Sequence, residues 1–135
     1  MAPRGTMSPS EHKLVFRRLI EEAFNAGRLA VLDEVLTADF AEHSPCRHRG
    51  SAATFRERIA LLRLAIPDLH VCIDDLAAGG DMTWAAISVC GTRSVPEERS
   101  VDFNRIDTCR YQDGRIAEYW SETSDLLEQL GITVT

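Results

Sequence analysis

The sequence lacks a long apolar run, because no segment approaches the roughly 20 consecutive apolar residues that a membrane-spanning helix requires. Its first residues, MAPRGTMSPSEHK, also lack the apolar region of a secretory signal. We expect residues 1–7 to form a disordered leader and residues 8–132 to form a single domain. The expected protein is cytoplasmic and has no membrane partner.

Positive charge is also scarce. Fifteen Lys and Arg residues stand against 21 Asp and Glu residues, which gives a formal net charge of -6, and no basic run offsets this locally. A negative field opposes contact with a phosphate backbone, so nucleic acid is not an expected partner. The GxGxxG, GxxxxGK[ST] and GxSxG motifs are all absent, which disfavours nucleotide-dependent and serine-nucleophile chemistry. We expect no cofactor.

Cysteine occurs only four times and never in a CxxC pair; the positions are Cys46, Cys72, Cys90 and Cys109. Three of them fall in strand-like segments, where free cysteine packs as a small hydrophobe, so we expect reduced thiols. His43, Cys46 and His48 are close in sequence. A zinc site needs a fourth ligand or a carboxylate in a defined geometry, so we expect no metal here.

Along the rest of the chain, the spacing of hydrophobic residues changes from a helical to a strand-like period. Fourfold spacing predicts helices over residues 8–27, 28–36 and 51–66, and twofold alternation predicts strands over 69–74, 82–91, 101–111 and 116–121. A short strand over 40–43, a loop over 44–50 and a helix over 125–130 complete the prediction. Helices followed by hairpin-linked strands indicate an α+β fold, with the helices on one face of an antiparallel sheet.

Several phrases occur in an order that resembles one family. They are EEAFNAG at 21–27, ADFAEHSP at 38–45, IPDLHVCIDDL at 66–76, GRIAEYW at 114–120 and DLLEQLG at 125–131. Together they resemble the SnoaL-like polyketide cyclases of the nuclear-transport-factor-2-like superfamily. The resemblance implies a cone-shaped half-barrel, in which a curved antiparallel sheet is wrapped by three N-terminal helices and a short C-terminal helix. It also implies an interior that holds a small apolar or carbonyl-containing ligand.

The resemblance implies cofactor-free ring closure by general acid/base catalysis, as in a cyclase or isomerase acting on a carbonyl compound. Members of the family carry a carboxylic acid seven residues beyond the glycine of the DG hairpin, and here that position is Ser121. A serine without a base cannot transfer a proton near neutral pH. The alternative is therefore a non-catalytic binding protein for a small apolar ligand.

The resemblance turns Asp107 and Tyr119 into the cone and makes them catalytic candidates. Asp107 equally fits a charge pair with Arg105 or Arg110 on a wet face. His43 is a third candidate because its family counterpart often faces the cavity, although a histidine hydrogen-bonded at a strand end fits as well. Asp125 is a fourth candidate at the mouth of the cone, and it also suits the first turn of a helix.

The expected ligand contacts come from helices and strands alike; they are Ser121, Arg105, Arg58, Phe24, Phe55 and Trp84. Phe24 stands where some cyclases place a tyrosine, and Arg58 stands where those enzymes have a small amide. Glu118 and Trp120 fall on the strand face opposite Tyr119. Because the outer face of this fold commonly packs against a second copy, the resemblance implies a homodimer.

Overall fold

The computed structural model describes residues 7–44, 47–94 and 98–121. The predicted leader, apart from Met7, lies outside these residues, as do Cys46, Asp125 and the helix predicted over 125–130. The helical segments are α1 (Pro9–Arg18), the π-helical η1 (Leu19–Asn25), the 3₁₀ turn η2 (Leu29–Val31), α2 (Leu32–Val35) and α3 (Ala52–Ala65). The strands are β1 (Leu36–Ser44), β2 (Arg47–Gly50), β3 (His70–Gly79), β4 (Met82–Arg93), β5 (Arg99–Gln112) and β6 (Arg115–Ser121).

The first helix begins where the sequence predicts. Ser8 accepts a hydrogen bond from the Glu11 backbone while Glu11 accepts one from the Ser8 backbone, which is a capping box, and Pro9 occupies the first turn. The helical path continues through η1 and ends before Gly27, whose φ is +74°. A Cβ at Gly27 would lie 2.6 Å from Nε of Arg63, so a larger residue here would be strained and crowded.

The six strands form one sheet in the order β2-β1-β6-β5-β4-β3. The neighbours from β3 to β6 are antiparallel, and Asp113 and Gly114 connect β5 to β6 with positive φ at both residues, as the DG signal predicts. Two expectations are wrong. β1 pairs with β6 in parallel, and residues 47–50 of the predicted loop form strand β2 beside β1.

The parallel pair has a topological cause. Two strands can run in parallel only when a long crossover joins them, and here α3 and the three strands β3, β4 and β5 separate β1 from β6 along the chain. Local hairpin signals specify neighbours along the sequence. They do not predict pairing between strands that are far apart in the sequence, such as β1 and β6.

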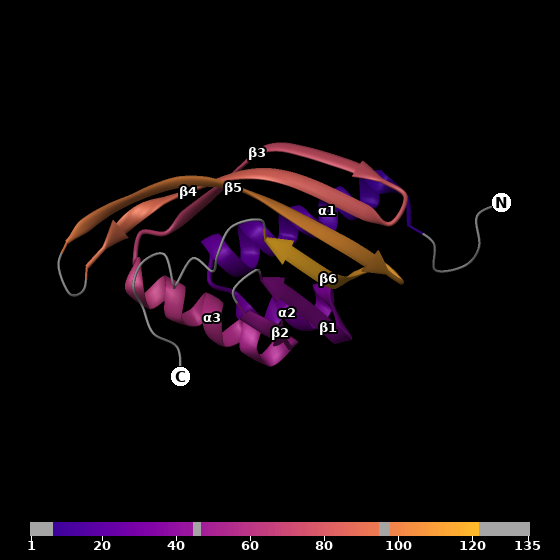
Figure 1. Ribbon diagram of the computed structural model, residues 1–135, viewed down its shortest axis with the longest axis horizontal. Coiled ribbons are helices and arrows are strands. Elements are labelled where there is room, and N and C mark those ends of the chain that lie inside the picture. Colours follow the sequence, from indigo (N-terminus) through magenta and orange to yellow (C-terminus); the bar gives the residue numbers. More distant parts are fainter. Residues whose placement is uncertain (1–6, 45–46, 95–97, 122–135) are drawn as a thin grey trace.

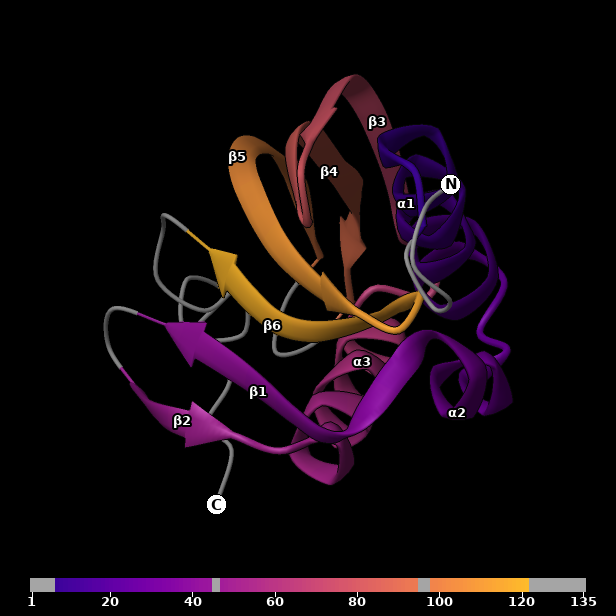
Figure 2. The same ribbon diagram turned by 90° about the vertical axis from the view of Figure 1, so that its right-hand side faces the viewer.

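The sheet curves around the helices without closing, which confirms the predicted α+β cone (Figures 1 and 2). Figure 2 shows α1 and α3 on the concave side, with the sheet passing from β3 through β5 and β6 to β2. Buried apolar side chains fill the space between helices and sheet; among them are Phe16, Leu19, Ile59, Ile87, Val89 and Ile116. Residues on the concave face therefore lie in the interior of the domain.

Candidate functional site

The concave face of β5 and β6 carries a polar cluster. Asp107 is fully buried and Tyr119 is 1% exposed, so the side of these strands that the resemblance turns inward is the buried one. In the strand register Asp107 is the partner of Ser121, and Cys109 is the partner of Tyr119. Asp107 therefore lies directly across from Ser121, the position at which the family acid was expected.

Two neighbours hold the Asp107 carboxylate. The hydroxyl of Tyr119 donates a hydrogen bond to Oδ2 of Asp107. Arg105 contacts both oxygens, with Nε 2.9 Å from Oδ1 and Nη2 3.3 Å from Oδ2. The contact to Oδ1 lacks hydrogen-bond geometry, so among the described residues this buried oxygen accepts no hydrogen bond.

Burial sets the protonation states of the two neighbours. Removal from water raises the pKa of the Tyr119 hydroxyl well above its ordinary value of 10.0, and the negative charge of Asp107 raises that pKa further. Burial alone would lower the pKa of Arg105, but the negative charge of Asp107 raises it above the ordinary value. Tyr119 is therefore neutral and Arg105 is cationic across the physiological range.

A second ion pair, between Glu42 and Arg58, lies on the same side of the sheet. Glu42 of β1 is the register partner of Tyr119, and its carboxylate receives a hydrogen bond from Nη1 of Arg58 on α3. The side chains of Glu42 and Arg58 are 8% and 15% exposed. Arg58, an expected ligand contact, thus reaches the interior, whereas Glu42 is a residue that the sequence reasoning missed.

Strand periodicity could have identified Glu42. Phe40 and Glu42 are two residues apart on β1, so they share a face, and an apolar residue such as Phe40 is expected to point into the core. Glu42 must then point inward and His43 outward. The family resemblance implies His43 at the interior, whereas the alternation of β1 indicates Glu42.

Aromatic side chains border the polar cluster. The ring of Phe55 on α3 lies 5.3 Å from the ring of Tyr119 and 5.1 Å from that of Phe40, measured between centroids. Phe24 of η1 completes the group with an edge-to-face contact of 6.1 Å to Phe55. Phe24 and Phe55 therefore lie beside the charged groups, and all three phenylalanines are buried.

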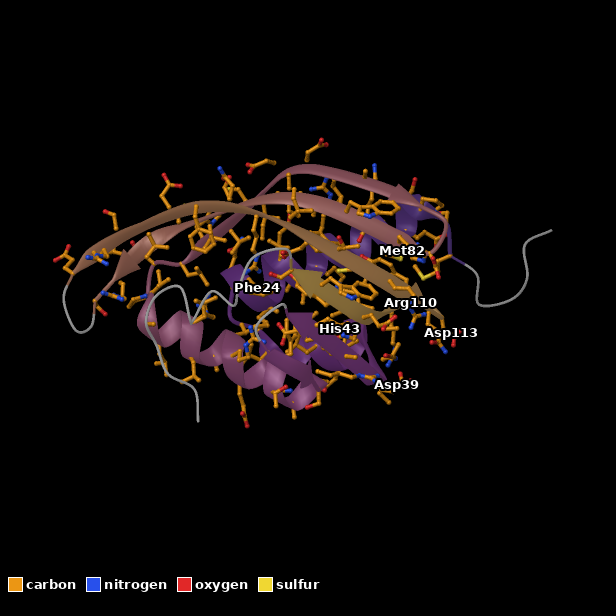
Figure 3. All side chains as sticks on the ribbon, in the orientation of Figure 1. Phe24, Asp39, His43, Met82, Arg110 and Asp113 are labelled. Carbon is orange, nitrogen blue, oxygen red and sulfur yellow. The ribbon has the colours of Figure 1, made fainter. Side chains whose placement is uncertain are left out.

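The expected interior position of His43 is wrong. Its Nε2 lies 3.1 Å from Oε1 of Glu118, and its ring stacks on Trp120 at 5.1 Å. Arg110 contacts the other Glu118 oxygen at 2.5 Å. These residues lie on the face of the sheet opposite Tyr119, since strand alternation separates them from Glu42, Tyr119 and Cys109. Two of them, His43 on β1 and Arg110 on β5, are labelled in Figure 3.

The expected contact of Trp84 with an interior ligand is also wrong. Trp84 is 44% exposed, and its register partners are Ala77 on β3 and Thr108 on β5. Thr108 pairs in turn with Trp120, which pairs with His43. Trp84 therefore belongs to a row across the outer face. Its neighbours Thr83 and Ala85 point inward instead, and both are buried.

Three further observations limit the chemistry that can be assigned. Within residues 7–44, 47–94 and 98–121, no three His, Cys, Asp or Glu side chains gather closely enough to hold a metal ion. In the same ranges, no helix is long and apolar enough to cross a membrane. Cys72, Cys90 and Cys109 are free thiols, as the sequence predicts for them.

The curved, unclosed sheet, with helices on its concave side and a polar cluster between them, defines a protein of the nuclear-transport-factor-2-like class. The sequence profile of the SnoaL-like polyketide cyclase family matches residues 14–130. The chain belongs to that family. No curated protein matches the sequence.

Solved structures of the same shape come from several bacteria. IdmH of Streptomyces antibioticus, a proposed polyketide cyclase, is 25% identical with a TM-score of 0.75, over 90% of this chain and 99% of IdmH. A proposed SnoaL-like polyketide cyclase of Jannaschia sp. CCS1 is 20% identical with a TM-score of 0.78, over 93% and 94% of the two chains. AclR of Streptomyces galilaeus, a proposed hydroxylase, is 22% identical with a TM-score of 0.77, over 92% and 98%.

Proposed function

We propose that this protein is a cofactor-free cyclase or isomerase, and that its Asp107 carboxylate moves a proton at the carbon next to a carbonyl group. One observation carries the proposal. A buried carboxylate stands directly across from Ser121, and one of its oxygens accepts no hydrogen bond from the described residues. A buried carboxylate oxygen that accepts no hydrogen bond is rare in proteins, and a catalytic role is one explanation for such an oxygen.

The roles of the neighbouring groups follow from their contacts. The single proton of Tyr119 is committed to Asp107, so Tyr119 positions the carboxylate and does not donate to the substrate. The guanidinium of Arg105, with the Ser121 hydroxyl across the strand pair, supplies positive charge and a donor for the carbonyl oxygen. A preorganised charge of this kind stabilises an enolate more strongly in a dry interior than in water.

The chemical step balances without a cofactor. Oδ1 of Asp107 takes the proton as the C–H bond breaks, and the electron pair of that bond forms the enolate. In a cyclase the enolate carbon attacks a second carbonyl of the same molecule, and the resulting alkoxide recovers the proton from Asp107. In an isomerase the proton returns to a different carbon of the same substrate. The family to which the chain belongs supports this class of reaction.

The proposal is tested by proton exchange on small aryl ketones, 1-tetralone among them, in heavy water with NMR detection. The wild-type protein should accelerate deuterium incorporation next to the carbonyl group. Arg105→Gln/Asp107→Asn should abolish the acceleration, and it removes both charges of the pair so that neither is left uncompensated. Asp102→Asn changes an exposed carboxylate on the opposite face of β5 and is the matched control. This variant should accelerate deuterium incorporation into the ketone as much as the wild-type protein does. Exchange at the buffer rate with wild-type protein on every ketone would refute the proposal.

A further inference from the structure

Strand β3 is the last of the six described strands in the sheet, so none of them pairs with its outer edge. A groove of about 300 Å³ lies beside this edge, lined by Glu21 and Asn25 from η1 and by Val71 and Ile73 from β3, among others. Figure 2 shows the helical segment next to β3. An accessible sheet edge of this kind can pair with a strand of another chain.

The Asn25 side chain takes the place of a neighbouring strand at Val71. Its Nδ2 donates a hydrogen bond to the Val71 carbonyl at 2.9 Å, and its Oδ1 accepts one from the Val71 N–H at 2.7 Å. A residue of a paired antiparallel strand makes the same two bonds. Arg63 of α3 donates to the Asn25 carbonyl at 2.8 Å and so fixes the end of η1 beside β3. The edge is therefore already occupied at Val71.

The outward positions beyond Val71 follow from strand alternation and from one bulge. Since both backbone groups of Val71 point away from β4, those of Ile73 do so as well. The register shifts between Ile73 and Asp75, so the next outward residue is Leu76, three positions further on. The N–H of Leu76 donates to Oδ1 of Asp75 at 2.9 Å. Within the described residues, Ile73 thus stands between two positions that side chains already bond.

Charge at the same edge opposes pairing between identical copies. Asp74 is the extra residue of the bulge, and both Asp74 and Asp75 are exposed. A second copy would bring two more carboxylates to the same short segment, and like charges on neighbouring strands are destabilising. The bulge also breaks the two-residue repeat that a regular partner strand follows.

We propose that the β3 edge, from Val71 to Leu76, is a strand-pairing surface that fits the same edge of a second copy, and that Asn25 and Asp75 keep it from pairing. A two-fold axis would set identical edges antiparallel, so that the donors and acceptors of one copy meet those of the other. With both side chains in place, the single position Ile73 is too short a segment for a strand pair. The proposal is independent of the proposed function, because it concerns the edge of the sheet and not its concave face.

Amide hydrogen exchange in the wild-type protein, followed by NMR, tests the bonded state of the edge. The amides of Val71 and Leu76 should exchange slowly, whereas that of Ile73 should exchange at least about tenfold faster than that of Val71. Asn25→Ala should accelerate exchange at Val71 by about tenfold, and exchange at Cys72, whose amide points toward β4, by a smaller factor. Equal exchange at Val71 and Ile73 in the wild type would overturn the proposal.

Removing both side chains should produce a new assembly. At the concentration used for NMR, sedimentation velocity of Asn25→Ala/Asp75→Ala should give about twice the mass of the wild-type particle. In this assembly the amide of Ile73 should exchange about tenfold more slowly than in the wild type, because it now bonds a strand of the second copy. An unchanged mass in a folded variant would overturn the proposal. A larger mass with fast exchange at Ile73 would also overturn it, since the contact would then lie elsewhere.

Two controls separate edge pairing from loss of folding. Arg17→Ala changes an exposed residue that lines the same groove from α1, and it should keep the wild-type mass. Circular dichroism checks the fold of each variant. If the double variant does not fold, Asn25→Ala alone frees Val71 beside Ile73 and should show the same two changes. If that variant does not fold either, exchange in the wild-type protein decides.

Discussion

The hydroxyl of Tyr119 donates a hydrogen bond to the carboxylate of Asp107, and neither side chain reaches the surface. The two residues lie on adjacent strands, two register positions apart on the same face, so strand pairing brings them together. Arg105 completes the group from the same strand as Asp107. A structural ion pair and a catalytic carboxylate both fit this geometry, and they respond differently to the loss of charge.

The first prediction separates stability from catalysis with a double-mutant cycle. Asp107→Asn leaves the Arg105 guanidinium buried without a counter-charge, so the free energy of unfolding should fall by about 3 kcal/mol. Arg105→Gln/Asp107→Asn should recover at least about 1 kcal/mol of that loss because no charge remains unpaired. Chemical denaturation measures the free energies of all variants. A double variant less stable than Asp107→Asn would contradict the buried-pair account.

The second prediction concerns the two tyrosines, which are the only ones in the chain. Burial raises the pKa of both Tyr119 and Tyr111, and the Asp107 charge adds to the effect at Tyr119. Absorbance of tyrosinate should therefore stay low in the folded protein as the pH passes 10.0, while the protein in denaturant titrates near that ordinary value.

The same shift fixes the sign of the pH dependence of stability. The folded state holds these two protons more tightly than the unfolded state does, so their contribution is complete below the unfolded pKa and is lost as the pH rises above about 10. The midpoint of urea unfolding should fall between pH 9 and about 11. Tyr119→Phe should reduce this alkaline loss. Tyrosinate absorbance rising near pH 10 in folded protein would show that the hydroxyls are solvated.

Local signals predicted most of the fold. The Ser8 capping box, the stop at Pro67 and the DG turn each act within a few residues, and the structure places α1, α3 and the β5–β6 hairpin accordingly. Strand β2 was missed because its four residues gain their hydrogen bonds from β1 alone. The parallel β1–β6 pair depends on the whole course of the chain, which no local pattern encodes.

The site was predicted only in part, for a related reason. Asp107, Tyr119 and Arg105 share a face by alternation, but both faces of β5 are polar, so the family resemblance was needed to choose the inner one. The same resemblance misplaced His43. Alternation starting at Phe40 points to Glu42 instead, and the contact of Glu42 with Arg58 depends on how α3 packs against β1.

The third prediction concerns the outer face. Arg110 lowers the pKa of Glu118 most strongly, through its hydrogen bond, and His43 adds a smaller effect of the same sign. A lowered folded pKa means that the contribution of Glu118 to stability is present above the ordinary value of 4.5 and is lost as the pH falls below it. Glu118→Gln should lower the free energy of unfolding by about 0.5 kcal/mol at pH 7, and the difference should vanish near pH 3. A difference that persists in acid would assign the effect to packing against His43.

The fourth prediction concerns assembly and follows from the row formed by Trp84, Thr108, Trp120 and His43 across the outer face. Trp84 is a large apolar side chain that is 44% exposed on this row, and large aromatic residues of this kind anchor protein interfaces. We expect a second copy of the chain to cover this face, and static light scattering at micromolar concentration should give the mass of two chains.

Trp84→Glu should give the mass of one folded chain, because it buries a charge at the interface while leaving the concave core untouched. Leu64→Glu on α3 is the control, since Leu64 is 75% exposed and points away from the sheet core, and this variant should keep the mass of two. A single-chain mass for the wild type, or an unchanged mass for Trp84→Glu, would show that the outer face is not a dimer interface.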